Sequence, residues 1–168
     1  MAFCIPYSVY LESPESFRAL SGPSDNCSAC GSTLSTPQGG NVQLQANVQG
    51  TQLNINFDQV TASGDTSISF FAESPENNLV IFTITSTAQY SGNIHIGFKA
   101  PDSITEQDFN DLFVFRYGPT GPDDITVNSG PYSRDYPSKM IYGVSTGFSE
   151  YGVAGKREEK YSCAKGWL

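Results

Sequence analysis

The chain contains a single histidine, His95, in the segment SGNIHIGFKAP. A histidine can ligate a metal or haem or act as a general base, and each role needs a partner side chain within reach. The sequence has no GxSxG nucleophile motif, and metal ligands from elsewhere in the chain are not visible in a sequence. Apolar and polar residues alternate here, with Ile94, Ile96 and Phe98 opposite Asn93, His95 and Lys99. We therefore expect a solvent-facing strand residue, with His95 a secondary candidate for ligand binding.

The four cysteines are the next candidates for chemistry: Cys4, Cys27, Cys30 and Cys163. An even number of cysteines in a chain poor in charge and rich in Ser and Thr predicts two disulfides and an oxidising compartment. Four cysteines allow three pairings, and the sequence does not choose among them. The alternative is a four-thiolate zinc site, but such sites usually carry two CxxC pairs and this chain has one, CSAC. A redox-active CxxC would need a βαβ pattern, which is absent around the motif.

Tyrosines gather between residues 131 and 151, and Tyr132, Tyr136 and Tyr142 are candidate ligand-binding residues. A tyrosine offers a flat apolar ring and a hydroxyl, which suit a sugar ring or a protein partner, although tyrosines also pack the ends of β-sandwiches. Arg116 is a further candidate because it shares a strand face with apolar Leu112 and Val114. An arginine on such a face pairs with a carboxylate or reaches a ligand. The carboxylates near it in sequence are Asp111, Asp123 and Asp124.

The net charge of the chain limits the classes of partner that it can bind. The net charge of −8 argues against nucleic acid and against anionic membrane surfaces, because both need clustered Lys and Arg. The acidic stretches PDSITEQDFND and GPDDITVNSG lack the ligand spacing of an EF-hand, so we expect solvated loops, with calcium at a loop tip as the alternative. No cofactor is predicted.

The elements that must position these residues are short strands. The segments VQLQANV and TQLNINF alternate between apolar and amide side chains on both sides of QG, which predicts a hairpin. Further strands are expected in TSISFFAES, NNLVIFTITST (apolar on both sides, hence central), GNIHIGFKA, DLFVFRY and DITVNSG, with one or two weaker strands between Gly130 and Gly155. In SITEQDFNDL, Ser103 with Glu106 or Thr105 with Asp108 would begin a short helix.

This pattern predicts a single all-β domain, an antiparallel β-sandwich of jelly-roll or immunoglobulin-like type with at most one short helix. We expect an irregular, cysteine-pinned arm over residues 1–40, the β-sandwich over 41–155 and a charged tail over 156–168. The start MAFCIPYSVYLES does not have the pattern of a signal peptide, and no run has the length of a membrane-spanning helix. Secretion is inferred from the cysteines alone.

The central segments NNLVIFTITSTAQYSGNIHIGFKAP, NDLFVFRYGPTG and SGPYSRDYP together resemble DOMON-type β-sandwich domains over residues 78–137. The shared pattern is a strand ending in a glycine-rich turn, a variable loop, and an acidic residue opening an apolar strand that ends near glycine. The family includes extracellular haem-binding cytochrome domains and sugar-binding modules. The haem branch implies a Met in the loop between Ala100 and Asp111 and a late His, and this chain has neither. The resemblance therefore implies ligand binding without haem.

The function that these observations favour is a non-enzymatic, carbohydrate-binding β-sandwich, lectin-like and secreted, whose partner is a glycan or another small polar ligand. A structural or assembly protein, such as an adhesin, coat or fibre-head domain that forms a homo-oligomer, is the second hypothesis. An isomerase or cyclase with a β pocket is the third, and the sequence offers no paired acid and base for it.

Overall fold

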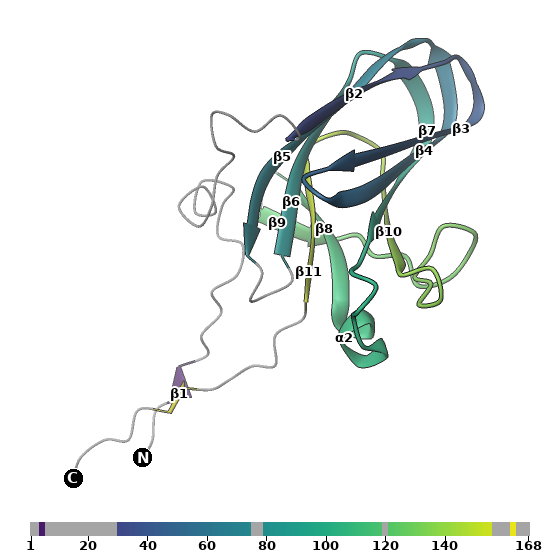
Figure 1. Cartoon of the computed structure of the whole chain (residues 1–168). Helices are drawn as coiled ribbons and strands as arrows, with labels where there is room; N and C mark the ends of the chain where they lie inside the picture. Colours follow the sequence, from purple (N-terminus) through teal and green to yellow (C-terminus); the bar gives the residue numbers. More distant parts are fainter. Residues whose placement is uncertain (1–3, 6–29, 75–78, 119–120, 156–161, 164–168) are drawn as a thin grey trace.

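A computed structural model of the chain describes residues 4–5, 30–74, 79–118, 121–155 and 162–163 (Figure 1). Its elements are β1 (Cys4–Ile5), β2 (Gly31–Thr36), β3 (Gly39–Val48), β4 (Thr51–Ala62), β5 (Gly64–Ser74), β6 (Leu79–Ser86), β7 (Gln89–Lys99), α2 (Glu106–Asp111), β8 (Leu112–Gly118), β9 (Gly121–Asp124), β10 (Met140–Ser145), β11 (Glu150–Gly155) and β12 (Ser162–Cys163). The prediction of an all-β fold with at most one short helix is confirmed for this part of the chain.

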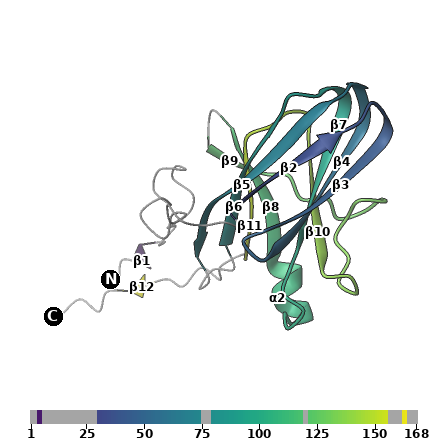
Figure 2. The ribbon, with the colours of Figure 1, turned by 45° about the horizontal axis from the view of Figure 1, so that its top comes forward.

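Two sheets face each other (Figure 2). One has four strands in the order β10-β7-β4-β3, and the other has six in the order β2-β5-β6-β11-β8-β9. Neighbouring strands are antiparallel in both sheets. The apolar strand β6 lies inside the larger sheet, as its sequence predicted, and β7 lies inside the smaller one. The molecule is therefore an antiparallel β-sandwich.

The β3–β4 hairpin shows how the local sequence specifies this arrangement. Val48 pairs with Thr51, so the loop consists of Gln49 and Gly50 alone. Both loop residues have positive φ, 50° and 76°, which is the pattern of a type I′ turn. Such a turn matches the right-handed twist of the two strands and fixes their register. The apolar residues of both strands consequently point to the same side.

The core lies between the sheets and is built from those apolar sides. Phe82 of β6 and Phe98 of β7 are fully buried, and their rings stack across the two sheets with centroids 6.1 Å apart. At one end of the sandwich, the rings of Phe57, Tyr90 and Phe148 contact one another, with centroids 5.3–5.8 Å apart. Burial of these rings supplies much of the free energy that holds the sheets together.

The short helix α2 begins as its sequence predicted. Thr105 is the N-cap, and its side-chain oxygen accepts a hydrogen bond from the backbone N–H of Asp108 at 3.1 Å. Of the two caps that the sequence offered, Thr105 with Asp108 is the one used. The helix is stabilised because one otherwise unpaired N–H is satisfied.

Two predictions about the elements are wrong. The arm expected over residues 1–40 contains β2, which pairs with β5, and the rest of the arm before residue 30 is described only at β1. The strand expected in DITVNSG is also absent, because β9 precedes it and only Thr126 forms a bridge, to Gly143. In the tail expected over 156–168, the described part is β12, which pairs with β1.

Gly152 makes a test of this packing, because it lies in β11 between β6 and β8. A Cβ there would lie 2.6 Å from the carbonyl oxygen of Val80 and would overlap the ring of Phe115. We expect Gly152→Ala to lower the free energy of unfolding by about 2 kcal/mol or more, since strands on both sides must move. Chemical denaturation measures this. Gly40→Ala is the matched control in β3, where a Cβ meets only a side-chain oxygen at 3.4 Å. Equal stability of the two variants would contradict the packing described.

Candidate functional site

The outer face of the four-stranded sheet carries polar side chains in rows across the strands. In one row, Gln43 is opposite Asn56, which is opposite His95. In the next row, Gln45 is opposite Asn54, which is opposite Gly97, and Gly97 is opposite Tyr142. We call the exposed and half-buried side chains of this surface, together with one loop tyrosine above it, the amide–tyrosine face: Gln43, Gln45, Asn54, His95, Tyr132 and Tyr142.

Gly97 determines where the ring of Tyr142 lies. A Cβ on Gly97 would be 2.5 Å from Cε1 of that ring, so the ring occupies the space that any other side chain would fill. Asn54 donates a hydrogen bond from Nδ2 to the Tyr142 hydroxyl at 3.3 Å. Tyr142 is thus laid along the sheet with its ring half-exposed, rather than projecting into solvent.

Tyr132 reaches the same surface from the connection between β9 and β10. Gln43 donates from Nε2 to the Tyr132 hydroxyl at 3.0 Å. The Tyr132 ring lies 4.8 Å from the His95 ring and 5.6 Å from the Tyr142 ring, centroid to centroid. Three residues that the sequence singled out, His95, Tyr132 and Tyr142, therefore form one cluster.

His95 is held in place by Asp58. Its Nε2 lies 3.2 Å from Oδ1 of Asp58, and the other carboxylate oxygen accepts a hydrogen bond from the backbone N–H of Asn93 at 2.8 Å. The register of β4 against β7 shifts between Phe57 and Gln59, which places Asp58 at the irregularity. The Nδ1 atom of His95 is buried and has no hydrogen-bond partner among the described residues. His95 is on the polar side of its strand, as predicted, with its ring set by a carboxylate.

The other two candidates, Arg116 and Tyr136, lie elsewhere. Arg116 is on the inner side of β8, and its guanidinium approaches Gly147. Its Nε is buried and unpartnered, and no described carboxylate forms an ion pair with it. Tyr136 packs on Phe109 of α2, at 5.5 Å between ring centroids, and Lys139 places its ammonium 3.1 Å from the Tyr136 ring centroid. Neither residue contributes to the amide–tyrosine face.

Arg134 is the positioning residue that the sequence did not reveal. Its guanidinium donates to the carbonyl oxygens of Phe109 and Leu112, each at 2.5 Å, and its Nε donates to Asn128 Oδ1 at 3.2 Å. Partial burial lowers the pKa of Arg134, and the nearby charges of Asp124 and Asp111 act in the opposite direction. The loop that carries Tyr132 is thereby fastened to the end of α2. A lone arginine between two tyrosines gave no signal of this role.

The described residues hold neither a group of metal-ligating side chains nor a membrane-spanning helix. Within them, no three His, Cys, Asp or Glu side chains are grouped so that they would hold a metal ion. Asp124, in one of the two acidic stretches, accepts hydrogen bonds from the backbone N–H and hydroxyl of Thr126 instead. No helix in this part of the chain has the length and apolar character needed to span a membrane.

Comparison of the chain with protein-family models, with curated proteins and with solved structures finds no match.

Arg134 can be tested by two substitutions. We expect Arg134→Met to lower the free energy of unfolding by about 2 kcal/mol, because two carbonyl oxygens lose charged donors. Arg134→Lys keeps the charge but lacks the planar fork, so it should recover little of this loss. Hydrogen exchange should speed up over residues 128–139 in both variants. If Arg134→Lys matched the parent in stability and in hydrogen exchange, the planar guanidinium would not be the group that holds the loop.

Proposed function

We propose that the protein is a non-enzymatic binding module for a neutral carbohydrate, and that the ligand binds on the amide–tyrosine face. The observation that carries the proposal is the gathering of the Tyr132, Tyr142 and His95 rings with the side chains of Gln43 and Asn54 on one sheet surface. The rings come from two strands and a separate loop, and only the folded chain brings them together.

The chemistry of this face suits sugars. A sugar presents hydroxyl groups that both donate and accept, and C–H faces that stack on aromatic rings. Amide side chains carry a carbonyl acceptor and an NH₂ donor, so Gln43, Gln45 and Asn54 match hydroxyl groups without a charge. The only ion pair described on this face is His95 with Asp58. A largely uncharged face favours a neutral ligand over a phosphate or sulfate.

The resemblance to DOMON-type domains adds a second, independent argument. That family includes sugar-binding modules as well as haem domains, and the haem-ligand residues implied by the resemblance are missing from this chain. The two arguments lead to the same class of ligand.

The test is a glycan array followed by calorimetric titration of the best ligand. We expect Tyr132→Ala and Asn54→Ala each to weaken binding about tenfold or more, because each removes a ring or a hydrogen-bonding amide at the centre of the face. Gln59→Ala is the matched control, since Gln59 is an exposed residue of the same strand as Asn54 and donates only to its neighbour's carbonyl.

Two results would overturn the proposal. One is the absence of any glycan bound by folded protein. The other is a glycan whose affinity is the same for Tyr132→Ala and the parent. Light scattering that shows a concentration-dependent oligomer, abolished by substitutions on this face, would instead favour the assembly hypothesis.

We also propose that the protein is secreted with two disulfides, Cys4–Cys163 and Cys27–Cys30. Cys4 and Cys163 are direct partners in the antiparallel pair of β1 and β12. Directly opposed residues of such a pair have Cα atoms about 4.5–5.5 Å apart, which is within the range that a disulfide spans. This pairing removes two of the three alternatives that the sequence left open.

Mass spectrometry of a non-reduced proteolytic digest tests the pairing. We expect a cross-linked peptide that joins the first and last cysteines and that disappears on reduction. Cys4→Ser with Cys163→Ser should lower the free energy of unfolding by about 2–5 kcal/mol if the bridge restricts the unfolded chain. A digest that links Cys4 to Cys27 or Cys30, or one that releases four free thiols, would contradict it.

A further inference from the structure

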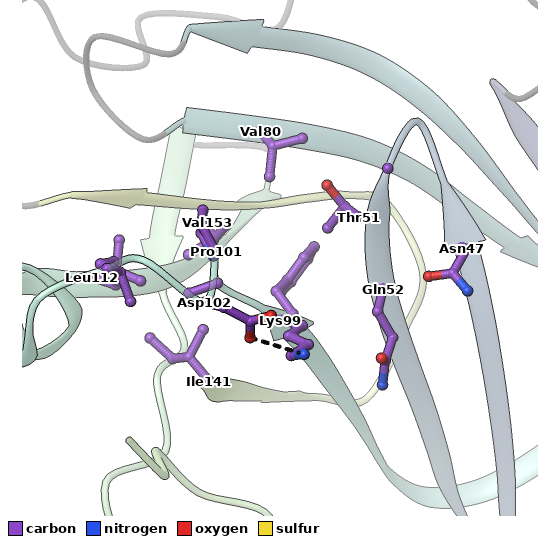
Figure 3. A pocket seen from close by; sticks show the side chains of 14 residues that line it. Asn47, Thr51, Gln52, Val80, Lys99, Pro101, Asp102, Leu112, Ile141 and Val153 are labelled. Carbon is purple, nitrogen blue, oxygen red and sulfur yellow. Dashed lines mark ion pairs between the residues drawn. The ribbon is translucent and has the colours of Figure 1, made fainter. Parts of the chain in front are cut away.

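A pocket of about 530 Å³ opens between the two sheets, below the β3–β4 turn (Figure 3). Its volume lies within the range of small-molecule binding sites. Val80 and Val153 line it from the six-stranded sheet, and Phe98 and Ile141 line it from the four-stranded sheet. The segment that links β7 to α2 forms a further wall through Pro101 and Ile104. None of these residues belongs to the amide–tyrosine face.

Apart from the buried ring of Phe98, the apolar part of the lining is aliphatic, whereas the amide–tyrosine face is aromatic and polar. Val80 and Ile104 are only partly buried and Pro101 is exposed, so the pocket keeps apolar surface in contact with water. The pocket presents no exposed tyrosine ring on which a sugar would stack. Covering this surface is favourable for an alkyl chain, because each buried CH₂ group contributes to binding. The inner part of the pocket therefore fits an unbranched hydrocarbon chain.

The rim of the pocket is polar and holds one cation. Asn47 and Gln52 lie on one side, while Lys99 and Asp102 lie on the other and form an ion pair with 3.2 Å between Nζ and Oδ1. Figure 3 shows the Lys99 ammonium facing the Asp102 carboxylate among the side chains that line the pocket. The Asp102 side chain is 84 % exposed and that of Lys99 is 35 % exposed. An ion pair this open to water is weak, so another carboxylate can displace Asp102.

We propose that this pocket binds an unbranched aliphatic carboxylate, with the chain between the two sheets and the carboxylate on Lys99. Lys99 supplies the cation among the residues that line the pocket, and Asp102, its ion-pair partner, lines the pocket as well. The amide of Asn47 offers a further donor to the same head group, whereas the Gln52 amide donates to Asn54 Oδ1 at 3.4 Å. Screening limits the effect of the protein's negative charge to about 8 Å at physiological ionic strength. The sign of the head group is therefore decided by Lys99 once the exposed Asp102 carboxylate is displaced from it.

Calorimetric titration with decanoate, decanol and decylamine tests the proposal on the full-length protein. We expect decanoate to bind most tightly. Lys99→Met should weaken decanoate roughly fivefold and leave decanol unchanged, since only the carboxylate uses the ammonium. Asp102→Asn should strengthen decanoate, because it removes the competing carboxylate. A substitution that disturbed the fold would weaken decanoate binding, so opposite effects of Lys99→Met and Asp102→Asn on decanoate affinity are not expected from such a disturbance.

Two further variants separate the pocket from other surfaces. Ile104→Trp should abolish decanoate binding by filling the pocket. Tyr132→Ala should leave it unchanged, so a failure of the carbohydrate proposal does not affect this one. Denaturation curves identify any variant that fails to fold. Tighter binding of decylamine than of decanoate, or decanoate binding unaffected by both Lys99→Met and Ile104→Trp, would overturn the proposal.

Discussion

The stacked contact between Phe82 and Phe98 joins the two sheets, and the orientation of the other residues of β7 depends on it. Successive side chains of a strand point to opposite faces. With Phe98 directed into the core, Gly97 and His95 must lie on the outer face. Leu53 and Ile141 are the partners of Phe98 in the neighbouring strands, so the same contact fixes which residues of β4 and β10 face outward. A shift of one residue would bury the polar set and expose the core.

Most of the four-stranded sheet was predictable because its alternation is strict and a glycine marks the turn between β3 and β4. β2 was not, because its residues, GSTLST, are mostly small and polar. Its backbone pairs with β5, and hydroxyl groups add bonds between the two strands: Thr33 bonds to Ser67 at 3.0 Å, and buried Thr36 bonds to Thr66 at 2.7 Å. A strand that pairs through its backbone and through hydroxyl groups leaves no hydrophobic period in its own sequence. Such a strand becomes visible only when its partner is known.

Part of the candidate site could be predicted from the alternation of polar and apolar side chains. The loop residues could not, because the sequence does not show which surface a loop packs against. The face of His95 followed from the alternation of its strand, whereas the segment of Tyr142 indicated only one or two weaker strands and gave no face for that residue. Tyr132 and Tyr136 are four residues apart in one loop, yet one packs over the sheet and the other against α2. Arg134 lies between them in the sequence. Its hydrogen bonds to the carbonyl oxygens of Phe109 and Leu112 hold the loop so that the two tyrosines point to different surfaces. Contacts with carbonyl groups more than twenty residues away in the chain carry no local signal.

The two proposed sites share β7, and this limits which residues can tell them apart. Gly97 positions Tyr142 on the outer face, while the adjacent Phe98 lines the pocket and holds the sheets together. A substitution at either position would alter both sites or the core, so a loss of binding there would identify neither ligand. Substitutions of Tyr132 and Ile104 can distinguish the two sites, because each residue comes from a connecting segment and contacts one site alone. Both surfaces carry amides, and Gln52 of the pocket donates to Asn54 of the amide–tyrosine face, but their apolar parts differ, since one offers tyrosine rings and the other aliphatic walls beside a cation. A ligand that suits one surface therefore has little to gain from the other, and their affinities can be changed independently.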